Sequence, residues 1–216
     1  MGLKRIVNEI TGTIDNLEKK LNGEIHVTRE DLIVLINSWG RTNYFYTKAF
    51  INSEVTIKSC KSNECYDLSK LDTSQVTDMD KLFMYSSFDG DISNWNVSNV
   101  TNMHAMFAFT NDFNSDIDNW NISNVTNMSE MFLYAKRFKS NIENWNVSNV
   151  VNMYGMFSYA DKFNSPLNNW NTSNVTNINK IFYNAKEFNQ NINNWNIEKI
   201  TEAYSVFLRL KNLINL

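Results

Sequence analysis

Cysteine and histidine are nearly absent from this sequence of 216 residues. Its cysteines are Cys60 and Cys65, and its histidines are His26 and His104. A structural zinc ion usually takes about four nitrogen or sulfur ligands, and His104 lies apart from the others inside a repeated segment. We therefore expect no metal site. We expect two free thiols, since a disulfide between them would require export to an oxidising compartment.

Motifs of catalysis are also lacking. The sequence has no clustered histidines, no glycine-rich phosphate loop, no G-x-S-x-G and no Cys/His pair at a useful spacing. Carboxylates fall mostly at positions that vary between repeats, such as Asp112, Glu130 and Asp161. Because catalysis needs a nucleophile, base or electrophile in a fixed constellation, we expect no enzyme and no cofactor.

Charge excess and long apolar runs are missing as well. The formal net charge is −3, which argues against a nucleic-acid partner held through phosphate contacts. No run approaches the roughly 20 apolar residues of a membrane-spanning helix, and the longest is 32–36. Residues 1–5 lead into an amphipathic run, unlike the continuous apolar core of a secretory signal. We expect no membrane insertion and, on this ground alone, a cytoplasmic location.

What the sequence does contain is a repeat. The words W-N-[VI]-S-N-V-T-N-M recur with a tryptophan every 25 residues, and such a fixed period is typical of a solenoid. Leu71 takes the tryptophan position in a first unit that is one residue short. We divide the region 71–207 into six units: 71–94, 95–119, 120–144, 145–169, 170–194 and 195–207.

Each unit carries two local patterns. Met128, Met131, Phe132 and Ala135 follow the i, i+3, i+4, i+7 spacing of an amphipathic helix, predicted over about 127–136. The run 117–122 has the L-x-x-L-x-L spacing of a leucine-rich-repeat strand. We therefore predict an α/β repeat solenoid that is leucine-rich-repeat-like. Short parallel strands would line the concave face, with short helices on the convex face.

Three columns of large apolar residues should form the core, because a repeat unit has no other way to bury its apolar face. The third column is Met103, Met128 and Met153, continued by Ile178. The first two columns are Trp95, Trp120, Trp145, Trp170 and Trp195, and Phe107, Phe132, Phe157, Phe182 and Phe207.

Asparagines flank each tryptophan of the repeats. Since side chains alternate along a strand, these amides should point away from the core. They could bond one another between repeats and merely solvate the sheet, or they could bind a polar ligand such as a glycan or peptide. The candidate binding residues are Asn96, Asn121, Asn146, Asn171 and Asn196, with Asn119, Asn144 and Asn169.

Atypical segments stand at both ends. Residues 1–22 predict an amphipathic helix whose apolar residues between 3 and 21 either pack on their own domain or mediate self-association. Residues 23–70 predict an α-rich N-terminal cap, with Thr28 as the N-cap of a helix that begins near Arg29. Residues 208–216 form a C-terminal cap or tail, because solenoids need atypical terminal units.

The repeat W-N-[VI]-S-N-V-T-N-M-x-x-M-F resembles that of the BspA-like bacterial family, a 25-residue lipoprotein-type repeat with a motif close to W-D-V-S-N-V-T-N-M-x-x-M-F. The opening L-D-T-S-Q-V-T-D-M at 71–79 is also similar, and the resemblance covers roughly 28–207. It implies a leucine-rich-repeat-like fold and a role in binding, often on cell surfaces, with no catalytic residues. Asn96, Asn121, Asn146, Asn171 and Asn196 stand where that family often has Asp.

Two functions remain open. The first is a non-catalytic protein–protein interaction scaffold, with another protein as the partner. The second is a cell-surface adhesin or glycan-binding module that uses the asparagine-lined face. The scaffold is favoured because no export signal is visible, whereas the family resemblance favours the cell surface.

Overall fold

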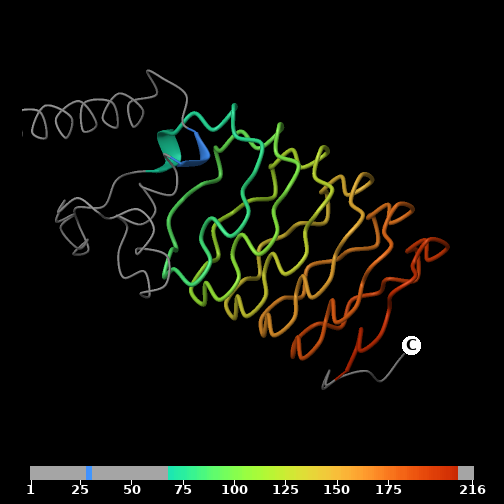
Figure 1. The fold of residues 1–216 in the computed structure, drawn as a ribbon. Coiled ribbons are helices and arrows are strands. Elements are labelled where there is room, and N and C mark those ends of the chain that lie inside the picture. Colours follow the sequence, from blue (N-terminus) through green and yellow to red (C-terminus); the bar gives the residue numbers. More distant parts are fainter. Residues whose placement is uncertain (1–27, 31–67, 209–216) are drawn as a thin grey trace, which may run out of the picture.

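The computed structural model describes residues 28–30 and 68–208 (Figure 1). The predicted helix 1–22, its self-association through 3–21, most of the 23–70 cap, Cys60, Cys65 and the tail beyond Leu208 lie outside the described residues. Arg29 and Glu30 are helical and Thr28 is not, in line with the helix start predicted from the sequence. The 3-10 helix η2, Leu68–Lys70, leads into the repeats.

From residue 71 the chain winds through a stack of similar coils (Figure 1). One coil corresponds to one sequence repeat, because isolated parallel bridges join equivalent residues of successive repeats. These bridges are Asp78↔Asn102, Asn102↔Asn127, Asn127↔Asn152, Asn152↔Asn177 and Asn177↔Glu202. Every residue thus lies beside its counterpart in the next coil, and a side chain repeated in the sequence becomes a column in space.

The helices and strands predicted for the repeats are wrong. Apart from η2 and the helical Arg29 and Glu30, the described ranges contain turns, irregular chain and single-residue bridges. The segment 127–136 is a series of turns, in which Glu130 and Tyr134 have φ of 58° and 57°. Because an α-helix needs negative φ throughout, this segment is not helical. The chain is therefore not an α/β solenoid with concave strands and convex helices.

Hydrogen bonding explains the difference. Three turns within the segment are closed by backbone hydrogen bonds. In one of them the N–H of Leu133 donates to the carbonyl of Glu130 at 3.0 Å. The alternate N–H groups leave the coil instead. Those of Met128, Glu130, Phe132 and Tyr134 donate to carbonyls of the next coil, at Asn152, Tyr154, Met156 and Ser158. In an α-helix each N–H would stay in its own segment, on the carbonyl four residues back.

We call this segment and its equivalents the turn wall: residues 79–85, 103–109, 128–134, 153–159, 178–184 and 203–208. Several residues of the turn wall have positive φ, in the left-handed region. That conformation raises the free energy of a residue other than glycine by about 1–2 kcal/mol. Only Gly155 among these positions is a glycine, with φ of 58°. The others are Lys81, Tyr85, Ala105, Phe109, Glu130, Tyr134, Tyr159, Lys180, Asn184 and Ser205. Each is held there by the bonds between coils and by packing of the core.

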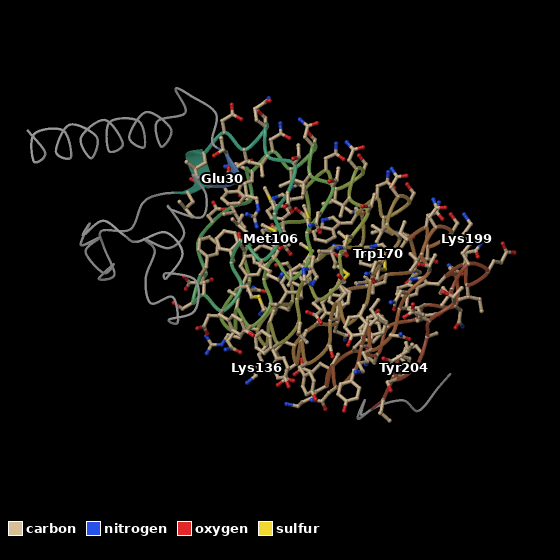
Figure 2. All side chains as sticks on the ribbon, viewed as in Figure 1. Glu30, Met106, Lys136, Trp170, Lys199 and Tyr204 are labelled. Atoms are coloured by element: carbon tan, nitrogen blue, oxygen red, sulfur yellow. The ribbon has the colours of Figure 1, made fainter. Side chains whose placement is uncertain are left out.

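The interior consists of the apolar columns. The tryptophans are 2–7% exposed, and the rings at Phe107, Phe132, Phe157 and Phe182 are fully buried. Phe132 and Phe157 stack at 5.7 Å between ring centroids with planes 4° apart. Figure 2 shows Met106 and Trp170 inside the stack, while Lys136, Lys199 and Tyr204 lie at its periphery. Burial of these rings is the main source of stability of the stack.

Candidate functional site

The asparagine column at Asn96, Asn121, Asn146, Asn171 and Asn196 is exposed. Each side-chain oxygen accepts the backbone N–H two residues later, as Asn121 does from Ser123 at 3.2 Å. This is an Asx-turn, which fixes the side chain. In the part of the chain that the structure describes, the Nδ2 groups of this column have no acceptor. They form a row of free donors that repeats from coil to coil.

The second predicted column is less uniform. Asn119, Asn144 and Asn169 are exposed. The Nδ2 of Asn169 donates to Oε1 of Glu143 at 3.0 Å, whereas the side chains of Asn119 and Asn144 make no hydrogen bond within the described ranges. The structure thus places the two predicted columns on either side of the buried tryptophans, and neither column forms a ladder of amides bonded to one another.

A ladder of side chains bonded to one another does form among the residues that make the parallel bridges between coils. Asn102 Nδ2 donates to Asp78 Oδ1 at 3.0 Å, and Asn127 Nδ2 donates to Asn102 Oδ1 at 3.2 Å. At the other end, Asn177 and Asn179 both donate to Glu202 Oε2 at 2.9 Å. Carboxylates therefore stand at both ends as acceptors. These side chains hold coils together, so we assign them to the framework.

A further asparagine column is also structural. The Nδ2 groups of Asn99, Asn124, Asn149 and Asn174 donate to serine carbonyls of the preceding coil at 2.7–2.8 Å. These residues satisfy backbone carbonyls that the turns would otherwise leave unpaired. Their amides are therefore engaged, which distinguishes them from the free amides beside the tryptophans.

Sequence reasoning missed a surface feature of the turn wall, which we call the aromatic column. It consists of Tyr85, Phe109, Tyr134, Tyr159 and Tyr183. Successive ring centroids are 4.7, 4.9, 4.1 and 5.3 Å apart. Tyr85 is 43% exposed and the others are half-buried. The sequence signal was an aromatic residue two positions after the buried phenylalanine, which holds for the first four members, whereas Tyr183 directly follows Phe182.

The rings from Tyr85 to Tyr159 stack and cover one another's faces, whereas the planes of Tyr159 and Tyr183 are 61° apart. The stacked part of the aromatic column therefore presents mainly ring edges and hydroxyl groups to solvent. Stacking also restricts the rotamers of each ring. The column is therefore a rigid stripe that is apolar in its body and polar at its rim.

Charged or titratable side chains also lie at the other end of the turn wall, in some of the coils. His104 Nδ1 lies 2.6 Å from Asp80 Oδ1, and its Nε2 lies 3.8 Å from Glu130 Oε2. Further along the stack, the Lys180 ammonium lies 5.9 Å from the ring centroid of Tyr154 and 5.7 Å from that of Tyr204. In the first coils carboxylates lie beside cationic or titratable groups, since Lys81 Nζ is also 3.4 Å from Asp80 Oδ2, and in the last coils Lys180 lies beside aromatic rings.

Ion pairs between coils occupy the corner that follows the turn wall. Arg137 lies 3.0 Å from Asp112, and Lys186 lies 2.7 Å from Asp161. Lys162 pairs with Glu187, whose hydrogen bond and negative charge raise the pKa of Lys162. These charges neutralise one another, and exposed pairs of this kind contribute little to stability.

Neither a metal centre nor a membrane span emerges from the described ranges. No group of three or more His, Cys, Asp and Glu side chains there could hold a metal ion. No helix there is long and apolar enough to cross a bilayer.

Comparison with known proteins gives one relationship. A family model matches the chain twice, over residues 51–142 and 117–215, and the two matches overlap within the repeats. The chain belongs to the family described as Mycoplasma protein of unknown function, DUF285. Membership of a bacterial repeat family, the coarser part of the prediction, is thereby confirmed. No curated protein and no solved structure matches this DUF285 chain.

Proposed function

We propose that this DUF285 protein is a non-catalytic scaffold that binds another protein through the aromatic column of its turn wall. The observation that carries the proposal is the exposed stack from Tyr85 to Tyr159, with neighbouring centroids 4.1–4.9 Å apart. Tyrosine is enriched at protein interfaces and among the residues that dominate binding energy. Because these rings are already ordered, a partner would lose little side-chain entropy on binding them.

The repeat words support the same class of function. Their likeness to the BspA-like motif is the finer family assignment that we propose here, and binding is the role that this likeness implies.

Paired substitutions test the proposal. Asn184 occupies the position of Tyr134 and Tyr159 in its own coil, with φ of 57°. The double variant Tyr134→Asn and Tyr159→Asn therefore removes two rings while keeping a residue that this backbone accepts. Its matched control is Asn121→Ser with Asn146→Ser, because serine also closes such turns.

Affinity purification from the native cell with mass spectrometry would compare the two variants. We expect the wild type and the asparagine control to capture the same protein, and the tyrosine variant to lose it. Capture that survives in the tyrosine variant and is lost in the control would contradict the assignment to the turn wall. Circular dichroism of all three proteins would check that each is folded.

The free Nδ2 groups of Asn96, Asn121, Asn146 and Asn171 favour one alternative: a glycan-binding or adhesive face. Amide donors at regular spacing suit sugar hydroxyls, whereas the stacked rings of the aromatic column have no open face for a sugar ring. Screening against immobilised glycans tests this alternative. Binding that is lost in Asn121→Ser with Asn146→Ser, and kept in the tyrosine variant, would establish it.

A further inference from the structure

A tripeptide of the repeats matches the acceptor of asparagine-linked glycosylation, which is Asn-x-Ser or Asn-x-Thr with x other than proline. In the described ranges it begins at Asn96, Asn99, Asn121, Asn124, Asn127, Asn146, Asn171 and Asn174. By sequence alone these positions are equivalent. The structure separates them, because the bond to a sugar forms at Nδ2 and their Nδ2 groups differ in surroundings.

Half of these Nδ2 groups are engaged. Those of Asn99, Asn124 and Asn174 donate to serine carbonyls of the preceding coil at 2.7–2.8 Å. That of Asn127 donates to Asn102 Oδ1 at 3.2 Å. Each of these nitrogens faces a neighbouring coil. A sugar there would have to enter the space between two coils, and the hydrogen bond that joins them would be lost.

The other half, at Asn96, Asn121, Asn146 and Asn171, are open. These side chains are exposed, and in the part of the chain that the structure describes their Nδ2 groups have no acceptor. Each Oδ1 accepts the backbone N–H of the serine in its own tripeptide at 3.1–3.2 Å. The turn therefore holds the amide oxygen and leaves the nitrogen available at the surface.

The same bonds favour reaction at the nitrogen. An amide nitrogen is a weak nucleophile, because its lone pair is delocalised into the carbonyl group. As it loses a proton and attacks, negative charge develops on Oδ1, and donors already aimed at that oxygen stabilise the charge. The serine N–H is such a donor in all four open tripeptides. In the first, the hydroxyl of Ser98 also donates to Asn96 Oδ1, at 2.7 Å.

We propose that Asn96, Asn121, Asn146 and Asn171 are acceptors of an N-linked sugar. The co-reactant is a sugar activated at its anomeric carbon by a diphosphate, and a separate transferase delivers it. A bond forms from Nδ2 to the anomeric carbon. The bond from that carbon to the diphosphate oxygen breaks, and its electron pair leaves with the diphosphate. The Nδ2 proton passes to a base of the transferase.

These acceptors include no residue of the aromatic column, so failure of this inference would leave the proposed function standing. The diphosphate belongs either to a nucleotide sugar or to a lipid-linked oligosaccharide. The attached group distinguishes the two sources. A single sugar identifies the nucleotide donor, and an oligosaccharide of fixed composition identifies the lipid-linked one.

Site-resolved mass spectrometry of the protein purified from its native cell tests the proposal. Electron-transfer fragmentation cleaves the peptide backbone and keeps the bond between asparagine and sugar. We expect sugar on peptides that contain the open acceptors. We expect none on the engaged positions, which are Asn99, Asn124, Asn127 and Asn174.

The last coil supplies a natural control. Asn196 forms the same turn, since its Oδ1 accepts the N–H of Glu198 at 2.9 Å. Glu198 stands in place of the serine, so the acceptor tripeptide is absent. We expect no sugar on Asn196 in the wild type, and a new sugar there in Glu198→Ser expressed in the same cell.

A matched pair of variants tests the role of the hydroxyl. Ser123→Ala keeps the backbone N–H and removes the hydroxyl, so the sugar on Asn121 should disappear while the other open acceptors keep theirs. Thr126→Ala makes the same kind of change in the engaged tripeptide of Asn124 and should leave the pattern of sugars unchanged. Circular dichroism checks that each variant is folded.

Three results would overturn the proposal. The first is a native chain whose intact mass equals that of its unmodified sequence. The second is sugar on the engaged asparagines as often as on the open ones. The third is sugar that stays on Asn121 in Ser123→Ala, because the tripeptide would then not be what the transferase recognises.

Discussion

The indole Nε1 of Trp145 donates to the carbonyl of Ile117, 28 residues earlier, at 3.0 Å. The same bond joins Trp120 to Ile92, Trp170 to Ile142 and Trp195 to Leu167 at 3.0–3.1 Å. Each tryptophan therefore fills the core of its own coil and also satisfies a buried carbonyl of the coil before it. This double role explains why tryptophan, and not another large apolar residue, recurs at this position.

Replacing Trp145 by phenylalanine should destabilise the protein by about 2–4 kcal/mol. The side chain is 3% exposed, so the change leaves a cavity, and the carbonyl of Ile117 also loses its donor. Urea unfolding measures the loss. Trp195→Phe serves as the comparison and should cost less, because Trp195 has no described coil above it. A Trp145 variant that loses less than about 1 kcal/mol would contradict the role of the indole N–H.

Asn127→Asp should produce a pH-dependent loss of stability. Asn127 Nδ2 donates to Asn102 Oδ1 at 3.2 Å, so a carboxylate there would face an oxygen with no cation nearby. That arrangement raises the pKa of the new carboxyl in the folded state. Its destabilisation should then be about 1–3 kcal/mol at pH 7, and it should shrink as pH falls from that raised pKa to the unfolded value of about 4.

Urea unfolding at pH 7 and pH 3.5, each relative to wild type, measures the effect of Asn127→Asp. The control Asn121→Asp keeps the turn-forming oxygen, and its nitrogen donates to no described residue, so we expect little change at either pH. Equal losses for the two variants would show that the ladder contributes nothing specific.

Gly155→Ala should cost about 1 kcal/mol while the protein still folds. The new methyl group fits, since its nearest neighbour, Cγ of Glu130, lies 3.6 Å away. The cost comes from φ of 58°, which an L-residue adopts with strain. Thermal unfolding of this variant is compared with that of Gly90→Ala, because φ of Gly90 is not positive. A larger loss at Gly90 would contradict the explanation.

Lys162→Gln should leave the unfolding midpoint at neutral pH unchanged, because the pair with Glu187 is exposed and screened by solvent. The pKa of Lys162 is raised above 10.5 by its hydrogen bond and attraction to Glu187. Any contribution to stability is therefore complete at neutral pH and disappears as pH rises through that raised pKa. Thermal scans at pH 7 in low and high salt test this, and a large salt-dependent drop would refute it.

The sequence predicted the stack but not the path of the chain within a coil. The regular spacing of Trp120, Trp145 and Trp170 was enough to place equivalent residues side by side. The helix prediction failed because Met128, Met131, Phe132 and Ala135 face inward in consecutive turns just as they would in a helix. Left-handed residues such as Glu130 and Tyr134 carry no local signal, since bonds to the next coil impose their conformation.

For the candidate sites, exposure was easier to predict than bonding. Alternation correctly placed Asn119 and Asn121 outside the core. It could not show which asparagines are engaged, because Asn99, Asn102 and Asn127 find their partners one coil away. The aromatic column can be recognised in the sequence as a repeated Phe-x-Tyr, but the contacts between its rings depend on the register between coils.

The shared direction of the hydrogen bonds also gives the stack an electrostatic axis. Peptide dipoles of the turn wall add along it, as they do in a helix, but with the opposite polarity relative to the chain. Within the described turn wall, the first coil therefore presents carbonyl oxygens and is the electronegative end. Arg29 donates to one of these carbonyls, that of Asp80, at the N-terminal end of the stack. A helix attracts cations to its C-terminus instead.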